Sequence, residues 1–92
     1  MMESVKYELR FSKLAAKNIK KLDRVTQERI KKSLLQLSES PFDFTKQDIK
    51  KLAGYTNSYR LRVGKYRILY TIMEHEIVIF VFNVDSRGDI YK

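Results

Sequence analysis

Residues 58–70 form the stretch of this sequence that most narrows the possible folds. Polar and apolar side chains alternate on both sides of Gly64-Lys65, with Tyr59, Leu61 and Val63 before the pair and Tyr66 and Ile68 after it. Alternation at period two predicts β-strands, and a glycine that supplies a positive φ angle predicts a two-residue hairpin turn. The sequence therefore predicts a β-hairpin centred on residues 64–65.

This turn fixes which residues of the hairpin face each other. Val63 pairs with Tyr66, Arg62 pairs with Arg67, and Arg60 lies diagonally adjacent on the same face. Like charges that lie opposite in a sheet cost stability. We therefore expect an anionic partner for the three arginines, and an RNA phosphate suits the two-pronged guanidinium group. The plainer alternative is that they form the solvated side of a strand.

Length and charge set the broad class of the protein. The 92 residues are enough for one hydrophobic core, so we expect a single domain over residues 1–92. Lys and Arg number 19 against 11 Asp and Glu, a net charge of +8 that favours nucleic acid or an acidic protein as partner. Cysteine is absent, and neither a secretory leader nor a membrane-spanning apolar run is evident. We expect a cytoplasmic protein without membrane association.

The N-terminal half predicts a strand followed by two helices. Residues 5–11 alternate at period two. Ser12 is a suitable N-cap for a first helix, and Asp23 is suitable for a second, whose apolar residues recur at helical spacing until Ser40-Pro41. Residues 42–57 show weak periodicity and predict a basic loop.

The C-terminal half predicts a three-stranded meander over residues 58–63, 66–73 and 76–83, with a second turn at Glu74-His75. We predict an α+β fold, in which the N-terminal strand and this mainly antiparallel meander form one sheet that the helical hairpin covers on one face. The expected core face carries Tyr59, Leu61, Val63, Tyr66, Ile68, Tyr70, Ile72, Ile77, Ile79 and Val81. The other face carries Arg60, Arg62, Arg67, Leu69, Thr71, Val78, Phe80 and Phe82.

The residue types favour RNA chemistry over metal or cofactor chemistry. The only histidine is His75, in a predicted turn, and the three glycines form no phosphate-binding cluster, so we predict no metal site and no cofactor. RNA carries its own nucleophile in the 2′-OH, so arginines can promote its cleavage by positioning the phosphate and stabilising the charge that develops there. The residues expected to bind RNA are Arg60, Lys50, Lys51 and Lys65.

The order of elements and four motifs together resemble the RelE/ParE toxin superfamily. The motifs are Lys51-Leu-Ala-Gly54, Tyr59-Arg-Leu-Arg62, Tyr66-Arg-Ile-Leu-Tyr70 and Val84-Asp-Ser-Arg87 with the later Tyr91. RelE-like members are toxins of type II toxin–antitoxin modules that cut mRNA in the ribosomal A site without a metal. The resemblance implies a cognate antitoxin in a hetero-oligomer, and mRNA and ribosomal RNA of a 70S-type ribosome as further partners.

The resemblance also implies roles for individual residues. Arg67 would hold the scissile phosphate, Arg87 would support transition-state charge, and Tyr91 would orient or stack on the substrate. Arg60 and Arg62 stand where RelE proteins often carry two lysines, one of them proposed as the general base; Arg62 completes the expected catalytic set. Because arginine does not release its proton usefully, the identity of the base stays open.

Two alternatives to RNA cleavage follow from the same resemblance. A ParE-like toxin shares the fold but poisons DNA gyrase through protein binding, and a degenerate toxin binds only its antitoxin. The presence of Arg67, Arg87 and Tyr91 together favours the RNA-cleaving interpretation.

Overall fold

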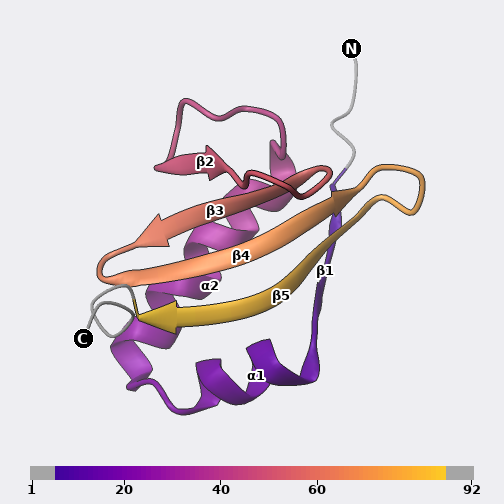
Figure 1. Ribbon diagram of the computed structural model, residues 1–92. Coiled ribbons are helices and arrows are strands. Elements are labelled where there is room, and N and C mark those ends of the chain that lie inside the picture. The colour runs from indigo at the N-terminus through magenta and orange to yellow at the C-terminus, as the bar shows by residue number, and fades with distance from the viewer. Residues whose placement is uncertain (1–5, 87–92) are drawn as a thin grey trace.

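The computed structural model describes residues 6–86, which form a five-stranded sheet with both helices packed on one of its faces (Figure 1). The elements in chain order are β1 (Glu8–Phe11), α1 (Lys13–Lys20), α2 (Arg24–Glu39), β2 (Ile49–Lys51), β3 (Ser58–Val63), β4 (Tyr66–Met73) and β5 (Val78–Ser86). The strand order is β1-β5-β4-β3-β2. β1 runs parallel to β5, and the other neighbours are antiparallel. The expected α+β class is confirmed.

Both helices begin at the capping residues that the sequence indicates. The Ser12 side chain accepts a hydrogen bond from the Ala15 backbone N–H at 3.0 Å, and Asp23 accepts one from the Thr26 N–H at 3.3 Å. Such bonds satisfy backbone donors that lack a partner in the first turn of a helix. No helix within residues 6–86 combines the length and the apolar character needed to cross a bilayer.

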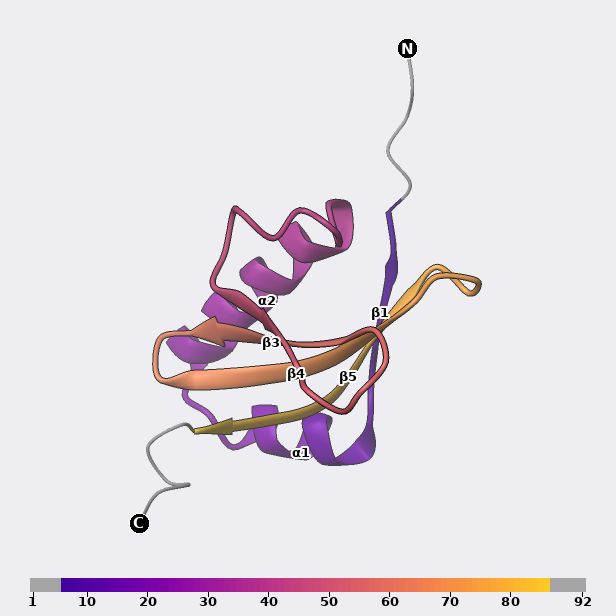
Figure 2. The same cartoon turned by 45° about the horizontal axis from the view of Figure 1, so that its top comes forward.

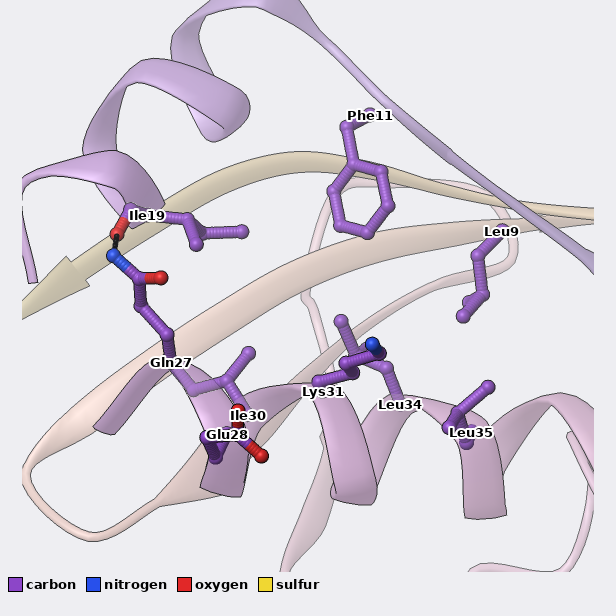
Figure 3. A pocket seen from close by; sticks show the side chains of 9 residues that line it. All are labelled: Leu9, Phe11, Ile19, Gln27, Glu28, Ile30, Lys31, Leu34 and Leu35. Atoms are coloured by element: carbon purple, nitrogen blue, oxygen red, sulfur yellow. Dashed lines mark hydrogen bonds between the residues drawn. The ribbon is translucent and has the colours of Figure 1, made fainter. Parts of the chain in front are cut away.

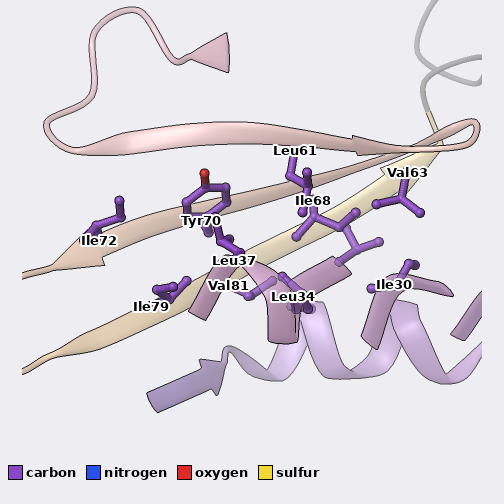
Figure 4. Close-up of a cluster of buried hydrophobic side chains, with 12 residues drawn as sticks. Ile30, Leu34, Leu37, Leu61, Val63, Ile68, Tyr70, Ile72, Ile79 and Val81 are labelled. Atoms are coloured by element: carbon purple, nitrogen blue, oxygen red, sulfur yellow. The ribbon is translucent and has the colours of Figure 1, made fainter. Parts of the chain in front are cut away.

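The core lies between α2 and the inner face of the sheet (Figure 4). Ile30, Leu34 and Leu37 of α2 recur at helical spacing and are almost completely buried. They pack against a layer of strand residues that comprises Leu61, Val63, Ile68, Tyr70, Ile72, Ile79, Val81 and Val84. Burial of this apolar surface is the main force that holds the helices against the sheet.

The expected loop over residues 42–57 contains a short edge strand. β2 pairs with β3 so that Ile49 faces Leu61 and Lys50 faces Arg60. Three residues are too few to show a period in the sequence, and the strand forms only because β3 offers an unpaired edge. The prediction of a loop was therefore wrong for this segment.

The turn between β4 and β5 is longer than expected. It spans residues 74–77, and Met73 pairs with Val78. Ile77 therefore lies in the turn with a φ of 56° and 41% exposure, so its placement on the core face was wrong. Val78, expected on the outer face, is 6% exposed. The pairing shifts by two residues, so the alternation survives and Ile79 still points inwards.

A β-bulge in β5 reverses this alternation further along the strand. Tyr70 pairs with Val81, whereas the preceding Leu69 pairs with Asn83, so Phe82 is an extra residue. Beyond the bulge Val84 points into the core and is 2% exposed. Its neighbour Asp85 consequently points to the outer face, where Arg67 is its register partner.

Candidate functional site

The outer face of the sheet, opposite the helices, carries Arg60, Arg62 and Arg67, which we call the arginine face. Arg62 and Arg67 are direct register partners in the β3–β4 hairpin, and Arg60 pairs with Leu69. Gly64 occupies the turn with a φ of 61°. The hairpin and its register are as the sequence predicts.

Arg67 binds a carboxylate of its own chain. Its Nε donates to Oδ1 of Asp85 at 3.0 Å, and its Nη2 donates to Oδ2 at 3.2 Å. The two side chains are only 23% and 29% exposed. Two parallel charge-assisted hydrogen bonds fix the plane of the guanidinium as well as its position. The sequence analysis missed Asp85 because the bulge that turns it outwards leaves no sequence pattern.

Asp48 supplies a second carboxylate to the arginine face. Nη2 of Arg60 donates to its Oδ1 at 2.8 Å, and Nε of Arg62 lies 3.7 Å from its Oδ2. The backbone N–H of Arg62 also donates to the Asp48 carbonyl at 2.9 Å. Asp48 immediately precedes β2, so the short edge strand places this carboxylate beside β3.

These contacts change how the facing arginines are explained. Among the described residues, two carboxylates accompany the three guanidinium groups, so part of the repulsion between the arginines is offset within the chain. Among the described residues, the three arginines outnumber these carboxylates by one, and Lys50 adds a further cation on the same side of the sheet. Arg62, at 34% side-chain exposure, is more accessible than Arg60 at 13%.

The three lysines expected to bind RNA do not all lie on this face. Lys50 pairs with Arg60 and shares its side of the sheet, whereas Lys51 pairs with Tyr59 and takes the opposite side. Lys65 lies in the hairpin turn, with its Nζ 5.6 Å from the centre of the Tyr66 ring. Arg87 and Tyr91 lie outside the described residues.

An aromatic residue that the sequence analysis did not single out covers another part of the outer face. The Tyr55 ring stacks on Phe82 with centroids 6.3 Å apart and an interplanar angle of 20°. The loop between β2 and β3 that carries Tyr55 passes over the sheet in Figure 2. The outer face thus has a cationic region beside the hairpin turn and an aromatic region partly covered by this loop.

On the helix side, an apolar groove of about 410 Å³ lies between β1, α1 and α2 (Figure 3). Leu9 and Phe11 of β1 face Leu34 and Leu35 of α2 across it. Phe11 is 41% exposed. Within residues 6–86, no cluster of three or more His, Cys, Asp or Glu side chains has the arrangement of a metal site.

Comparison with known proteins identifies the family of this chain. The family described as "ParE toxin of type II toxin-antitoxin system, parDE" matches residues 9–91. This chain belongs to the RelE/ParE toxin family. The resemblance inferred from the hairpin and C-terminal motifs is confirmed.

Two relatives with similar sequences are named RelE and RelG. The chain is 34% identical to the mRNA interferase toxin RelE of Escherichia coli K12, over 88% of this chain and 83% of that protein. It is 31% identical to toxin RelG of Mycobacterium tuberculosis, over 94% of this chain and 97% of the relative.

Solved structures of RelE proteins share the fold. The archaeal RelE–RelB complex of Pyrococcus horikoshii matches with a TM-score of 0.79 and 27% identity, covering 91% of this chain and 98% of that chain. The isolated RelE toxin of E. coli matches with a TM-score of 0.75 and 30% identity, covering 87% of this chain and 83% of that chain.

Proposed function

We propose that this chain is the toxin of a type II toxin–antitoxin module and that it cleaves mRNA on the ribosome. The observation that carries the proposal is the pair Arg62 and Arg67, which face each other on the open side of the sheet in a RelE-like chain. A relative 34% identical to this chain is named an mRNA interferase. Guanidinium groups held in this way suit the binding and stabilisation of a phosphate.

The proposed chemistry is attack of the RNA 2′-OH on the adjacent phosphate: the 2′-oxygen loses its proton and bonds to phosphorus, while the bond from phosphorus to the 5′-oxygen breaks and that oxygen takes up a proton. Arg67 binds the scissile phosphate, and Arg62 stabilises the negative charge that grows on its oxygens. Arg87 and Tyr91 complete the catalytic set, and their roles rest on the motif resemblance. Arg60, Lys50, Lys51 and Lys65 bind flanking RNA; of these lysines, Lys50 and Lys65 have the most direct access to the arginine face.

The proposal includes partners and a place of action. Residues 1–92 act as one toxin domain in the cytoplasm, where translating ribosomes present mRNA. A cognate antitoxin binds the toxin in a hetero-oligomer; similar solved structures include RelE–RelB complexes from P. horikoshii and E. coli. The apolar groove beside α2 offers such a protein the hydrophobic surface that a stable interface requires.

The decisive experiment is primer-extension mapping of mRNA ends in a translating extract. Wild-type protein should create new ends within codons, and Arg67→Ala should abolish them. Arg10→Ala is a matched control, because Arg10 is an exposed arginine on β1, the edge strand farthest from β2 and β3. Among the described residues it forms an ion pair only with Glu8. Antitoxin binding and a thermal melt verify that each variant is folded. Full cleavage by Arg67→Ala would refute the catalytic assignment.

The second candidate is a ParE-like toxin that acts on DNA gyrase. The family description, which refers to ParE, is the observation that favours it. Intact mRNA in the extract, together with growth arrest and inhibited DNA supercoiling, would support this candidate. Absence of both effects would indicate a degenerate toxin that only binds its antitoxin.

A further inference from the structure

Two hollows flank the tip of the β3–β4 hairpin where it meets α2. One measures about 480 Å³ and is bordered by Arg29, Lys32 and Arg62. The other measures about 330 Å³ and is bordered by Arg29 and Lys65. Both hollows also share Val63 and Gly64 in their walls, so they adjoin at the hairpin tip. We call the two hollows together the basic trough and define it by Arg29, Lys32, Arg62 and Lys65.

The basic trough concentrates positive charge, and of its four cations only Arg62 has a carboxylate nearby among the described residues, that of Asp48 at 3.7 Å. No acidic residue of the described chain lines either hollow. Arg29 and Lys32 form no ion pair with any residue in the described range 6–86. They are three residues apart on α2, a spacing that places like charges side by side on a helix and destabilises it slightly. An anion bound in the trough would relieve this repulsion.

Arg29 lies against the hairpin tip at Gly64. A Cβ atom at this position would stand 3.6 Å from Nη1 of Arg29, so the guanidinium lies against the turn at ordinary contact distance. The side chain of Arg29 thereby stands between the two hollows. Its fork of N–H donors is the group best suited to hold phosphate oxygens on either side.

We propose that the basic trough binds the phosphodiester backbone of the RNA strand that continues from the arginine face. Arg62 connects the two surfaces, because it borders the trough and is the register partner of Arg67. A strand whose scissile phosphate lies at Arg67 therefore meets Arg62 next and then Arg29 and Lys32. This inference rests on the proposed function, since it assumes that the strand on the arginine face is RNA.

The lining of the trough favours RNA over an acidic segment of a protein. Its lining combines the four cationic residues with polar residues of α2 and the turn at Gly64, and Val63 and Tyr66 add apolar surface. The apolar groove on the other side of α2 has the opposite character, with Leu9, Phe11 and Leu34 in its walls. A folded protein partner gains most binding free energy from the apolar groove, because it can bury hydrophobic surface there. The polyanionic backbone of RNA gains most from the cations of the trough.

The test compares RNA binding by two double variants that remove the same charge. Arg29→Gln/Lys32→Gln removes two cations from the trough, and Lys6→Gln/Lys13→Gln removes two exposed cations near β1 and the start of α1. Binding of fluorescent oligouridylate is measured by anisotropy over a series of salt concentrations. One probe of about 12 nucleotides spans both surfaces, and a short probe of about 3 nucleotides occupies the arginine face alone.

We expect the trough variant to bind the long probe about 10-fold more weakly, with the slope of log affinity against log salt reduced by about 1.4, since each single-strand phosphate contact contributes about 0.7. Its affinity for the short probe should change less than about 2-fold, and the control variant should lose little with either probe. Equal losses in both double variants would overturn the inference and leave only a general electrostatic effect.

Two further arms separate other occupants. If the trough variant binds the long probe normally but loses affinity for purified ribosomes, the site belongs to ribosomal RNA and the assignment to the substrate strand is wrong. If it loses affinity only for the antitoxin, the trough is a protein interface. Cleavage in translating extract is a separate readout: wild-type protein that binds the long probe through the trough but cuts no mRNA would refute the proposed function and retain the RNA site.

Discussion

Arg67 and Asp85 bind each other across β4 and β5 through two hydrogen bonds of 3.0 and 3.2 Å, and the bulge at Phe82 makes this pairing possible. Without the extra residue, the alternation of β5 would turn Asp85 towards the core. The same bulge buries Val84. One local irregularity thus completes the hydrophobic core and sets the orientation of the proposed phosphate-binding arginine.

Replacing Asp85 with Asn should separate binding from cleavage. Loss of the carboxylate removes negative charge beside Arg67, so RNA affinity should rise about 2- to 5-fold at low salt. The guanidinium also loses a bidentate partner that fixes its plane, so the cleavage rate at saturating ribosome should fall about 10-fold. Single-turnover assays in translating extract and anisotropy measure the two effects.

Asp48→Asn is the matched control for that variant, because it removes the same charge from the arginine face but touches Arg60 and Arg62. It should tighten RNA binding without a comparable loss of rate. Faster cleavage by Asp85→Asn would show that the carboxylate blocks Arg67 instead of positioning it.

Arg60 and Arg62 should differ in what they contribute. The Arg60 side chain is 13% exposed and donates to Asp48 at 2.8 Å, so Arg60→Gln should mainly lower the free energy of unfolding, by about 1 kcal/mol given the exposure of Asp48. The Arg62 side chain is 34% exposed, so Arg62→Gln should mainly affect RNA, weakening its binding by about 10-fold and also lowering the cleavage rate. Urea unfolding and anisotropy on both variants check this division, and a reversed pattern would contradict it.

Tyr70 should make the protein less stable in alkaline solution. The residue is completely buried, and its hydroxyl has no hydrogen-bond partner among the described residues. Burial raises the pKa of this hydroxyl well above its usual range, with a smaller contribution from Tyr59. The unfolded chain loses the proton near pH 10 while the folded chain retains it, so the free energy of unfolding falls as the pH rises above about 10.

Tyr70→Phe tests this prediction directly. The variant should match wild type or gain up to about 1 kcal/mol at neutral pH, because it removes an unsatisfied buried polar group. Its advantage should grow above pH about 10. Chemical denaturation at neutral and alkaline pH measures the difference between the two proteins, and a constant difference would contradict the assigned pKa direction.

Gly64→Ala should lower stability by about 1–2 kcal/mol, because the φ of 61° lies in the left-handed region that a Cβ atom disfavours. The cost is conformational, since the nearest side-chain atom would lie 3.6 Å from the new Cβ. Gly64→Asn serves as the comparison, because Asn tolerates this conformation better. In urea unfolding, the free energy of unfolding should be highest for wild type, lower for Gly64→Asn and lowest for Gly64→Ala. An equal decrease in both variants would instead indicate a steric cause.

The parts of the site that the sequence predicted correctly depend on neighbours in the chain. The pairing of Arg62 with Arg67 follows from a two-residue turn at Gly64, and the caps at Ser12 and Asp23 follow from local side-chain chemistry. Such signals lie within a few residues of the structure they determine. They sufficed to place three arginines on one face of a sheet.

The carboxylates at that face depend on contacts between distant segments. Asp48 reaches Arg60 because β2 adds to the open edge of β3, and Asp85 reaches Arg67 because Phe82 bulges out of β5. Neither the edge strand nor the bulge produces a periodic pattern in the sequence, because each depends on the pairing and packing of the completed sheet. The sequence by itself determined the helices, the hairpin and its facing arginines, whereas only the tertiary structure decided which anions accompany them.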